Sequence, residues 1–375
     1  MNSLARFLNK IKKDYLFYFS KLTNRALVAP DMLQIMITTK CNLKCQICDV
    51  WSQKFNNELT TAEVKNLIDQ ALKMGIETIY FTGGEALLRP DIFELINYAS
   101  RPQSTTTLNT NGSLVTKDMA QKIFSSNLDS ISFSIDSVSP QIHNAIRGEQ
   151  VFEKAIKGIK YLQNLKKENG QRKNSRKQKL DINIASVIIK PNKKELFSLA
   201  MLARDLECNT ISFQPIVYNG NLLKSADLIS EYSIDSEDIA DLKESFNQLQ
   251  KISDKDFIVF LMPEKTIQYF QKQKRVNTCF AGFNRIFINP QGDISFVCFE
   301  SFGNIKKDLL KKAWQSKKAN TLRGKTKKCT VNCTQFCSER PTSETLRAIH
   351  LNLAHKIKNQ SRLFKRIKNK LKKTS

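Results

Sequence analysis

The chain has 375 residues, enough for one large domain and a smaller one. Hydrophobic residues make up 41% of it, which excludes a globally disordered protein. The formal net charge of +25 favours acidic partners, namely nucleic acid, an anionic membrane surface or an acidic substrate, although a lysine-rich composition habit of the source would explain it equally well.

The chain shows neither a secretory signal nor a membrane span. Residues 1–22 lack the continuous apolar core, ended by small residues, that marks a signal peptide. No apolar run approaches the roughly 20 residues that cross a bilayer. We therefore expect a cytoplasmic protein, in which clustered cysteines bind metal more often than they form disulfides.

Residues 1–32 form a basic amphipathic segment. Its apolar side chains occur among lysines and are Leu4, Phe7, Leu8, Ile11, Tyr15 and Phe19. Such a helix can pack on the protein, lie on an anionic membrane or bind RNA. We favour these in that order, which allows a peripheral position at the inner membrane surface. Nucleic acid is the least favoured partner because no RNA-binding signature accompanies the charge.

From residue 33 the chain alternates between apolar, β-branched runs and helical patterns. The clearest helix begins with the capping-box pair Thr60 and Glu63 and ends before Gly75. Further helices are expected near 116–126, 151–166 and 193–206. The expected strands are Gln34–Thr38, Thr78–Thr82, Thr105–Thr110, Ser130–Ile135, Leu180–Ile188 and Thr210–Gln214. This alternation predicts an α/β fold with a parallel sheet in a partial or full barrel, whose chemistry gathers at the carboxyl ends of the strands.

Three cysteines directly follow the first expected strand with the spacing C-x3-C-x2-C. They are Cys41, Cys45 and Cys48. Structural zinc needs four closed ligands, and no fourth cysteine or histidine is near. Three thiolates suit a [4Fe–4S] cluster with one iron left open for a small ligand, which indicates catalysis rather than plain electron transfer. A zinc knuckle completed by a remote ligand stays open as the alternative.

Polar motifs end the next three expected strands. Gly83-Gly84-Glu85, the glycine motif, follows the second strand; its glycines let the backbone approach a ligand closely, and its carboxylate can receive an ammonium group. Asn111 follows the third strand, while Ser134 and Asp136 mark the fourth. Each of these alone is equally consistent with an ordinary turn or cap.

Together these motifs resemble the signature of the radical S-adenosylmethionine (SAM) superfamily. The resemblance covers residues 33–215 and implies a partial (β/α)6 TIM-type barrel. It implies that the three cysteines hold a [4Fe–4S] cluster whose open iron binds SAM, that the glycine motif holds the SAM amino group, and that the later motifs contact its ribose and carboxylate. The SAM-binding residues implied are Gly83, Gly84, Glu85, Asn111, Ser134 and Asp136. Ala86 stands where the family usually has Pro, a mild departure.

The cysteine content rises again near the end of the chain. Residues 216–275 form a helical connecting region, residues 276–342 a second domain, and residues 343–375 a basic amphipathic helix. Two β-rich runs flank Pro290-Gln291-Gly292-Asp293, which predicts a hairpin. The cysteines around and after it are Cys279, Cys298, Cys329, Cys333 and Cys337. Their spacing suits either an iron–sulfur site or a structural zinc ribbon.

This second domain resembles the SPASM or twitch extension of radical SAM enzymes, which carries auxiliary iron–sulfur clusters. The resemblance implies a small C-terminal cysteine-rich β-hairpin and loop domain with one auxiliary [4Fe–4S] cluster, because five cysteines do not ligate two unless a non-cysteine ligand or the substrate fills a site. The implied ligands are Cys279, Cys298, Cys333 and Cys337, with Cys329 as the alternative. Cys208 stands alone and is expected to be a buried core thiol.

The resemblance implies an enzyme that cleaves SAM reductively to a 5′-deoxyadenosyl radical, which abstracts hydrogen from a substrate. It suggests peptide modification or oxidation of a sugar-like alcohol, with a reductant such as flavodoxin or ferredoxin; the sequence identifies neither the substrate nor a catalytic residue. The contrasting hypothesis is a non-enzymatic iron–sulfur or zinc protein, either an electron carrier or a nucleic-acid-binding module, which the charge of +25 favours. The glycine motif argues against it, because a carrier needs no ammonium-binding carboxylate.

Overall fold

The computed structural model describes residues 3–169, 180–217, 226–272, 279–296, 298–327 and 329. Its strands are β1 Met32–Met36, β2 Thr78–Thr82, β3 Thr105–Thr110, β4 Ser130–Ser134, β5 Asp181–Ile188, β6 Thr210–Pro215, β7 Ile258–Phe260, β8 Arg285–Ile288, β9 Asp293–Ser295 and β10 Gly303–Asn304. Its α-helices are α1 Ser3–Thr23, α2 Thr61–Lys73, α3 Ile92–Ala99, α4 Lys117–Ser125, α5 Pro140–Arg147, α6 Val151–Asn169, α7 Leu196–Asp205, α8 Ala226–Tyr232, α9 Ile239–Leu249, α10 Pro263–Lys272, α11 Leu310–Gln315 and α12 Lys317–Lys327. Short 3-10 turns are Val50–Ser52, Ala86–Leu88 and Lys190–Asn192.

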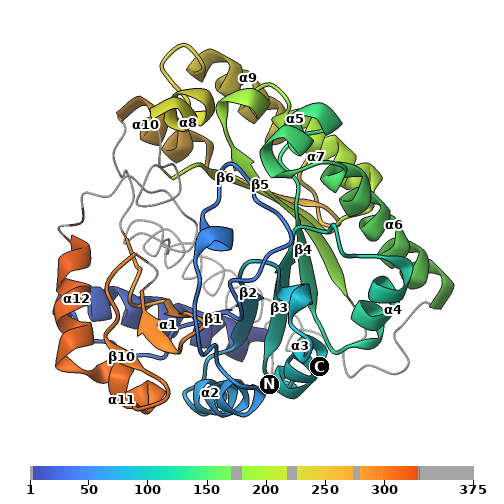
Figure 1. The fold of residues 1–375 in the computed structure, drawn as a ribbon. Coiled ribbons are helices and arrows are strands. Elements are labelled where there is room, and N and C mark those ends of the chain that lie inside the picture. The colour runs from blue at the N-terminus through green and yellow to red at the C-terminus, as the bar shows by residue number, and fades with distance from the viewer. Residues whose placement is uncertain are drawn as a thin grey trace, which may run out of the picture.

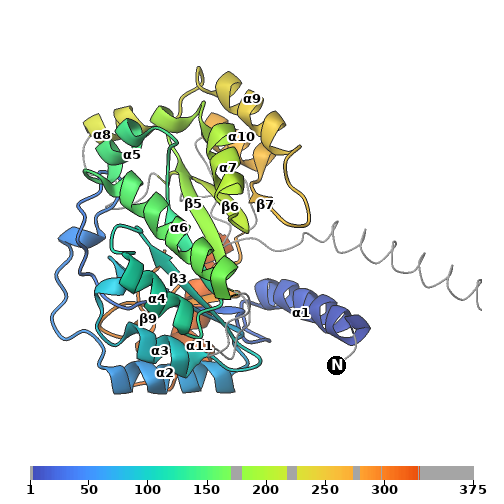
Figure 2. The same cartoon turned by 90° about the vertical axis from the view of Figure 1, so that its right-hand side faces the viewer.

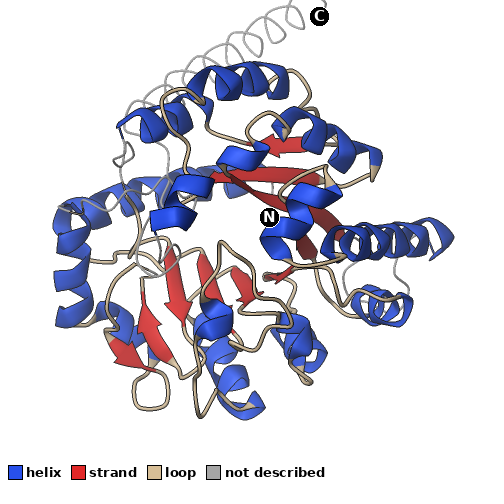
Figure 3. Ribbon diagram, turned by 45° about the horizontal axis from the view of Figure 1, so that its top comes forward, coloured by secondary structure: helices blue, strands red, loops and turns tan. Residues whose placement is uncertain are grey.

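One sheet organises the molecule, with the strand order β10-β9-β8-β1-β2-β3-β4-β5-β6-β7. Strands β1 to β7 pair in parallel with their chain neighbours. The strands form an open arc, and helices α2 to α7 lie around its outer side (Figures 1 and 3). This is the expected α/β partial barrel, and the first six strands begin and end within two residues of their predicted limits.

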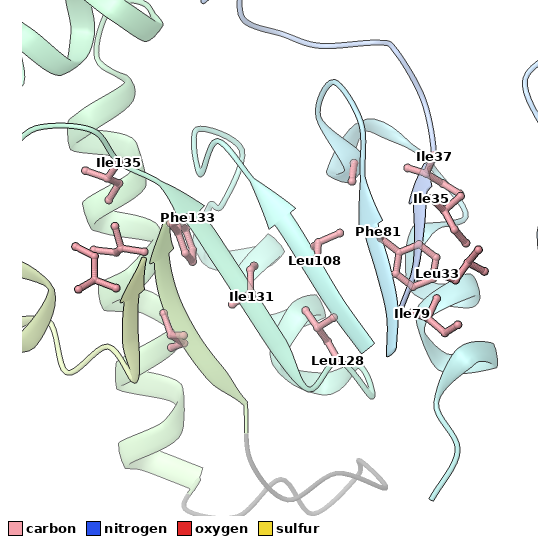
Figure 4. Packing of buried hydrophobic residues seen from close by; sticks show 14 of the residues in the cluster. Leu33, Ile35, Ile37, Ile79, Phe81, Leu108, Leu128, Ile131, Phe133 and Ile135 are labelled. Atoms are coloured by element: carbon pink, nitrogen blue, oxygen red, sulfur yellow. The ribbon is translucent and has the colours of Figure 1, made fainter. Parts of the chain in front are cut away.

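The core lies between the sheet and its helices. In β1, Leu33 and Ile35 are fully buried, and in β2 the matching residues are Ile79 and Phe81. Figure 4 shows these side chains in a row across adjacent strands. Burial of each large apolar side chain contributes about 1.5–3 kcal/mol, so the alternating pattern holds the strands in register. On the other face of β2 the residues are Thr78, Tyr80 and Thr82, which are only partly buried.

Helix α2 shows how local sequence sets an element's limits. The side chain of Thr60 accepts a hydrogen bond from the Glu63 backbone N–H, and the Glu63 carboxylate accepts one from the Thr60 N–H, which is the predicted capping box. Beyond the last turn, Gly75 has a φ of 85°, a value that glycine adopts without strain. Helices α3 and α5 were not expected from the sequence, and α6 extends three residues past its predicted end.

The cysteine-rich hairpin is continuous with the barrel sheet. Strands β8 and β9 pair antiparallel around the turn at residues 289–292, as predicted. Strand β8 also pairs in parallel with β1, from Met32 opposite Arg285 to Ile35 opposite Ile288. Residues separated by about two thirds of the chain therefore form neighbouring strands. Between the barrel and the hairpin, β7 adds a parallel strand next to β6 in a region expected to be helical.

Helix α1 lies at one side of the body (Figure 2). Its second half is anchored: Phe17 is fully buried against Phe280 and Phe283, next to the hairpin. The Lys13 ammonium lies 2.9 Å from the Asp31 carboxylate just before β1. No helix in the described part of the chain is long and apolar enough to cross a membrane.

Candidate active site

A cavity of about 170 Å³ lies at the carboxyl ends of the first strands. Its wall combines thiols, backbone of the glycine motif, hydroxyls, amides and one guanidinium. The lining residues are Cys41, Leu43, Cys45, Cys48, Val50, Trp51, Thr82, Gly83, Gly84, Asn109, Thr110, Asn111, Ser134 and Arg147. Because parallel strands bring their carboxyl ends to one edge, motifs from β1 to β4 meet here.

The three thiols of the first cysteine group share this cavity. Cys45 is buried, whereas Cys41 and Cys48 are partly exposed. Burial raises the pKa of all three thiols, that of Cys45 to about 11. Within the described residues, no three His, Cys, Asp or Glu side chains are grouped closely enough to hold a single metal ion. Because burial raises their pKa, the thiols stay protonated at neutral pH until a positively charged group displaces their protons.

The glycine motif packs against the cysteine loop. Gly84 donates its N–H to the Thr38 carbonyl at 2.9 Å, and Glu85 donates to the Lys40 carbonyl at 2.8 Å. A Cβ atom at Gly83 would lie 2.4 Å from the Thr38 carbonyl oxygen, and one at Gly84 would lie 2.3 Å from that of Lys40. Glycine is required here because two backbones touch, and this contact sets the position of the thiols relative to the motif.

The Glu85 side chain is fully buried behind the cavity wall. Its Oε1 accepts hydrogen bonds from the Leu87 N–H at 3.1 Å and the Thr110 hydroxyl at 2.9 Å, and its Oε2 accepts one from the Asn111 N–H at 2.8 Å. Burial raises the pKa of this carboxyl, although the hydrogen bonds from the three donors act to lower it. Through these hydrogen bonds the carboxylate links the segment after β2 to the end of β3.

Asn111 extends the same network to the cysteine loop. Its amide donates to the Asn42 side-chain oxygen at 3.0 Å, and its own oxygen accepts from the Ser113 N–H at 2.9 Å. Asn42 in turn donates to the Ser113 hydroxyl at 2.8 Å. Ser134, at the end of β4, lines the cavity directly. Both residues named from the sequence are therefore at the cavity.

Asp136 is fully buried and is not part of the cavity wall. Its Oδ2 lies 2.6 Å from Arg147 Nε, and its Oδ1 accepts a hydrogen bond from the Val187 N–H at 2.9 Å. Burial opposes ionisation of the carboxyl, but the guanidinium holds the pKa of Asp136 below its usual value. The same pair raises the pKa of Arg147, so both groups are charged at neutral pH.

The positive charge of Arg147 acts on the thiols of Cys45 and Cys48. Its guanidinium lowers the pKa of Cys45 and Cys48 against the effect of burial, and its carbonyl accepts a long 3.7 Å hydrogen bond from the Cys45 thiol. Arg147 is not among the SAM-binding residues predicted from the sequence. Its helix was detectable, because Ser139 caps it and Pro140 occupies its first position.

The structure describes three of the five cysteines of the second group. Cys279 lies six residues before β8 and Cys298 three residues after β9, so both flank the open end of the hairpin. Cys279 is buried, Cys298 is exposed, and Cys329 follows α12. Cys333, Cys337 and the expected C-terminal helix 343–375 lie outside the described residues. Cys208 is buried in the main core, where burial raises its pKa to about 12.

The donors at the cavity fit an iron–sulfur cluster with an open coordination position. Three thiols share one wall, a guanidinium favours the ionised forms of Cys45 and Cys48, and backbone and hydroxyl groups complete the lining. Such a lining has hydrogen-bonding groups for an amino acid ligand next to the thiols. The arrangement can therefore hold a metal cluster and a polar cofactor side by side.

Sequence comparisons agree with this geometry. Residues 35–173 match the radical SAM superfamily, and residues 279–337 match the SPASM iron-sulfur cluster-binding domain. An AdoMet-dependent heme synthase of Oleidesulfovibrio alaskensis is 36% identical over 129 residues, 34% of this chain and 33% of the relative. Mycofactocin maturase MftC of Mycolicibacterium smegmatis is 32% identical over 141 residues, 37% of this chain and 36% of the relative. These matches span about a third of the curated relatives' length.

Solved structures share the fold. Streptococcus suis SuiB bound to its precursor peptide SuiA has a TM-score of 0.63 at 18% identity, over 86% of this chain and 72% of that one. The enzyme anSMEcpe with bound AdoMet has a TM-score of 0.58 at 17% identity, over 77% of this chain and 82% of that one. With its two family matches and its thiol-lined cavity, the chain belongs to the radical SAM superfamily and carries a C-terminal SPASM domain.

Proposed function

We propose that the chain is an enzyme that cleaves SAM reductively and uses the product to modify an organic substrate. The observation that carries the proposal is the meeting of three thiols, the glycine motif and Arg147 in one cavity. Cys41, Cys45 and Cys48 would hold the [4Fe–4S] cluster. When bound, the reduced cluster supplies the electron that splits SAM into methionine and a 5′-deoxyadenosyl radical, which removes a hydrogen atom from the substrate.

The chain's own residues would bind and orient SAM. Gly83 and Gly84 line the cavity with backbone, so backbone groups can receive the amino group. Arg147 offers the cationic group for the carboxylate, and Ser134 adds a hydroxyl. Asn111 contributes polar contacts from the third strand end. The guanidinium also favours the thiolate forms that ligate iron.

Glu85 and Asp136 have supporting positions in this proposal. Glu85 fixes the backbone of Asn111 through a 2.8 Å hydrogen bond, and Asp136 fixes Arg147 through the 2.6 Å ion pair. Both carboxylates are fully buried. A direct contact of the Glu85 carboxylate with the SAM amino group, as the resemblance implies, would require the cavity wall to open, because the side chain is fully buried.

The substrate is proposed by class. The names of the relatives include a heme synthase, a maturase and a probable GTP 3′,8-cyclase, so a match in the barrel does not select among substrates. We propose peptide modification first, supported by the shared fold with peptide-bound SuiB, and oxidation of a sugar-like alcohol second. A flavodoxin or ferredoxin would supply electrons. The protein would act in the cytoplasm, with α1 and the C-terminal segment as candidate contacts to an anionic membrane.

The SPASM domain would hold one auxiliary [4Fe–4S] cluster. The proposed ligands are Cys279, Cys298, Cys333 and Cys337, with Cys329 as the alternative to one of the last two. The domain limits stay as proposed from the sequence, with the barrel at 33–215 and the auxiliary domain at 276–342. Such a cluster can accept an electron from the substrate radical or bind the substrate.

The test is anaerobic incubation of the iron-loaded protein with SAM and dithionite, followed by chromatography for 5′-deoxyadenosine. We expect product from the intact protein and none from Cys45→Ala. Cys208→Ala is the matched control, because it removes a buried thiol remote from the cavity lining and should keep activity. A fully loaded intact protein that forms no 5′-deoxyadenosine would refute the proposed function.

A further inference from the structure

Helix α1 projects from one side of the body, and its two faces differ (Figure 2). Toward the body, Phe17 is fully buried and the Lys21 ammonium donates to the Cys279 carbonyl at 2.9 Å. A helix turns about 100° per residue, so Phe19 lies about 200° around from Phe17, on the outward face. Phe19 is 51% exposed, and Leu22, one turn further on, is 55% exposed. The anchored helix therefore presents apolar side chains outward as well as toward the core.

The segment after α1 forms a groove with α12. The groove has a volume of about 760 Å³ and is lined by Arg25 and Leu27 from one segment and by Lys317 from the other. The Leu27 N–H donates to the Ser20 hydroxyl at 2.9 Å, which folds this segment back onto the last turn of α1. Leu27 is 50% exposed. The groove therefore adds a third exposed apolar side chain, and two cations, next to the end of α1.

The sequence on both sides of the groove is basic. Residues 15–30 and 309–327 contain no Asp or Glu. Arg25 and Lys317 are exposed, and neither forms an ion pair within the described part of the chain. Lys12, two turns before Phe19 on the same helix face, is also exposed. This surface, here called the α1–α12 patch, consists of Phe19, Leu22, Arg25, Leu27 and Lys317.

We propose that the α1–α12 patch docks on the surface of an anionic lipid bilayer. The headgroup layer has phosphates for Arg25 and Lys317, and the acyl boundary beneath it accepts Phe19, Leu22 and Leu27. Charge complementarity together with the apolar side chains selects this partner, because a nucleic acid would pair with the cations but not with the leucines. Stable membrane association needs two such contributions, since either alone is weak.

The inference rests on the cytoplasmic placement in the proposed function, because the cytoplasmic leaflet carries the negative surface potential. It goes further by assigning the contact to five described side chains instead of to a whole helix. Since Phe17 and Lys21 hold α1 against the body, docking would also fix the orientation of the barrel on the bilayer.

The experiment is flotation of the iron-loaded full chain with vesicles made of equal parts phosphatidylcholine and phosphatidylglycerol, compared with vesicles of phosphatidylcholine alone. Phe19→Ser removes an apolar side chain without changing the charge. Its matched control is Phe260→Ser, because Phe260 is 50% exposed on β7, at the opposite end of the sheet order from the hairpin.

The charge is tested separately. The double variant Arg25→Gln with Lys317→Gln removes the two cations of the groove. Its matched control is Lys122→Gln with Lys157→Gln, which removes two exposed cations from α4 and α6 on the other side of the arc (Figure 1). Both double variants have the same net charge, so a difference between them reports position.

We expect the intact protein to float with the anionic vesicles and far less with the neutral ones. Each cation near an anionic surface contributes about fivefold in affinity, so Arg25→Gln with Lys317→Gln should weaken binding roughly 25-fold. Phe19→Ser should weaken it about tenfold. The two controls should change it far less, because their side chains do not face the bilayer.

Equal losses in the patch variants and their controls would overturn the proposal, because binding would then follow net charge alone. Absence of flotation by the intact protein, or unchanged binding of Phe19→Ser, would also overturn it. If Phe19→Ser does not fold, Phe19→Trp decides: brominated lipids should quench the added tryptophan, whereas an unquenched residue contradicts insertion. The assay is independent of SAM cleavage, so a protein that floats but forms no 5′-deoxyadenosine refutes the proposed enzyme and supports the membrane contact.

Discussion

Removal of Arg147 from its buried ion pair with Asp136 should strongly destabilise the barrel, which Arg147→Met can test. The substitution leaves the Asp136 carboxylate with no exposed surface and one remaining donor, the Val187 N–H at 2.9 Å. Breaking a buried pair by removing one partner costs about 3–5 kcal/mol. We expect a loss of this size at pH 7.5 in urea denaturation of the iron-free protein, where cluster binding does not contribute.

The loss should depend on pH with a defined sign. In the intact protein the pKa of Asp136 lies below its usual value, so the carboxylate contributes stability above that value and loses it as the pH falls. Without Arg147, burial, the largest influence on this carboxyl, is opposed mainly by the Val187 N–H and raises its pKa. The variant then gains relative stability as Asp136 becomes protonated, so its deficit should be smaller at pH 5 than at pH 7.5.

Two controls define the result. Arg204→Met breaks an ion pair of similar length, 2.7 Å to Asp254, but both side chains are more than two-fifths exposed, and its effect should be a small fraction of that at Arg147. The double variant Asp136→Asn with Arg147→Met removes both charges and should recover part of the loss. A deficit for Arg147→Met below about 1 kcal/mol would contradict the reasoning, because it would place the pair among weakly coupled surface contacts.

Three further predictions concern the site. Gly84→Ala should abolish iron binding by the first cysteine group, measured as iron content, because its Cβ would lie 2.3 Å from the Lys40 carbonyl oxygen. Glu85→Gln should keep iron but weaken SAM binding roughly tenfold or more in equilibrium titration, because in either orientation its amide places an N–H against a backbone donor, that of Asn111 or that of Leu87; unchanged affinity would show that the carboxylate network is dispensable. Burial lowers the pKa of His143 from 6.5 to about 4, so the free energy of unfolding should fall by up to about 3 kcal/mol as the pH drops from 6.5 to 4, and His143→Gln should remove that part of the slope in urea denaturation.

Local sequence patterns were sufficient to predict most of the strands and helices of the barrel. The capping pair Thr60 and Glu63 and the alternating apolar residues of the strands predicted elements that the structure contains. Both signals act within a few residues and are visible in the sequence. The thiol spacing and the glycine motif likewise predicted which loops meet, because parallel strands bring successive loops to the same edge.

Other features depend on partners far away in the chain. Glu85 looks like a free ligand in the sequence, yet Thr110 and Asn111 occupy its carboxylate. Asp136 looks like a site residue, yet its partner Arg147 is the one that lines the cavity. Neither arrangement follows from spacing, because the distance from Glu85 to Asn111 is set by the pairing of β2 with β3.

The pairing of β8 with β1 has a consequence for how the protein is made. Strand β1 acquires β2 on one edge once residue 82 has been synthesised, but its other neighbour is complete only at residue 288. At about 5–20 residues per second, the intervening stretch of about 200 residues takes roughly 10–40 s to translate. For that time a nascent barrel carries an open, mostly apolar strand edge, the feature that invites pairing with other chains. Products that stop before residue 285 would keep this edge permanently, so premature termination should yield aggregation-prone fragments rather than a smaller soluble barrel.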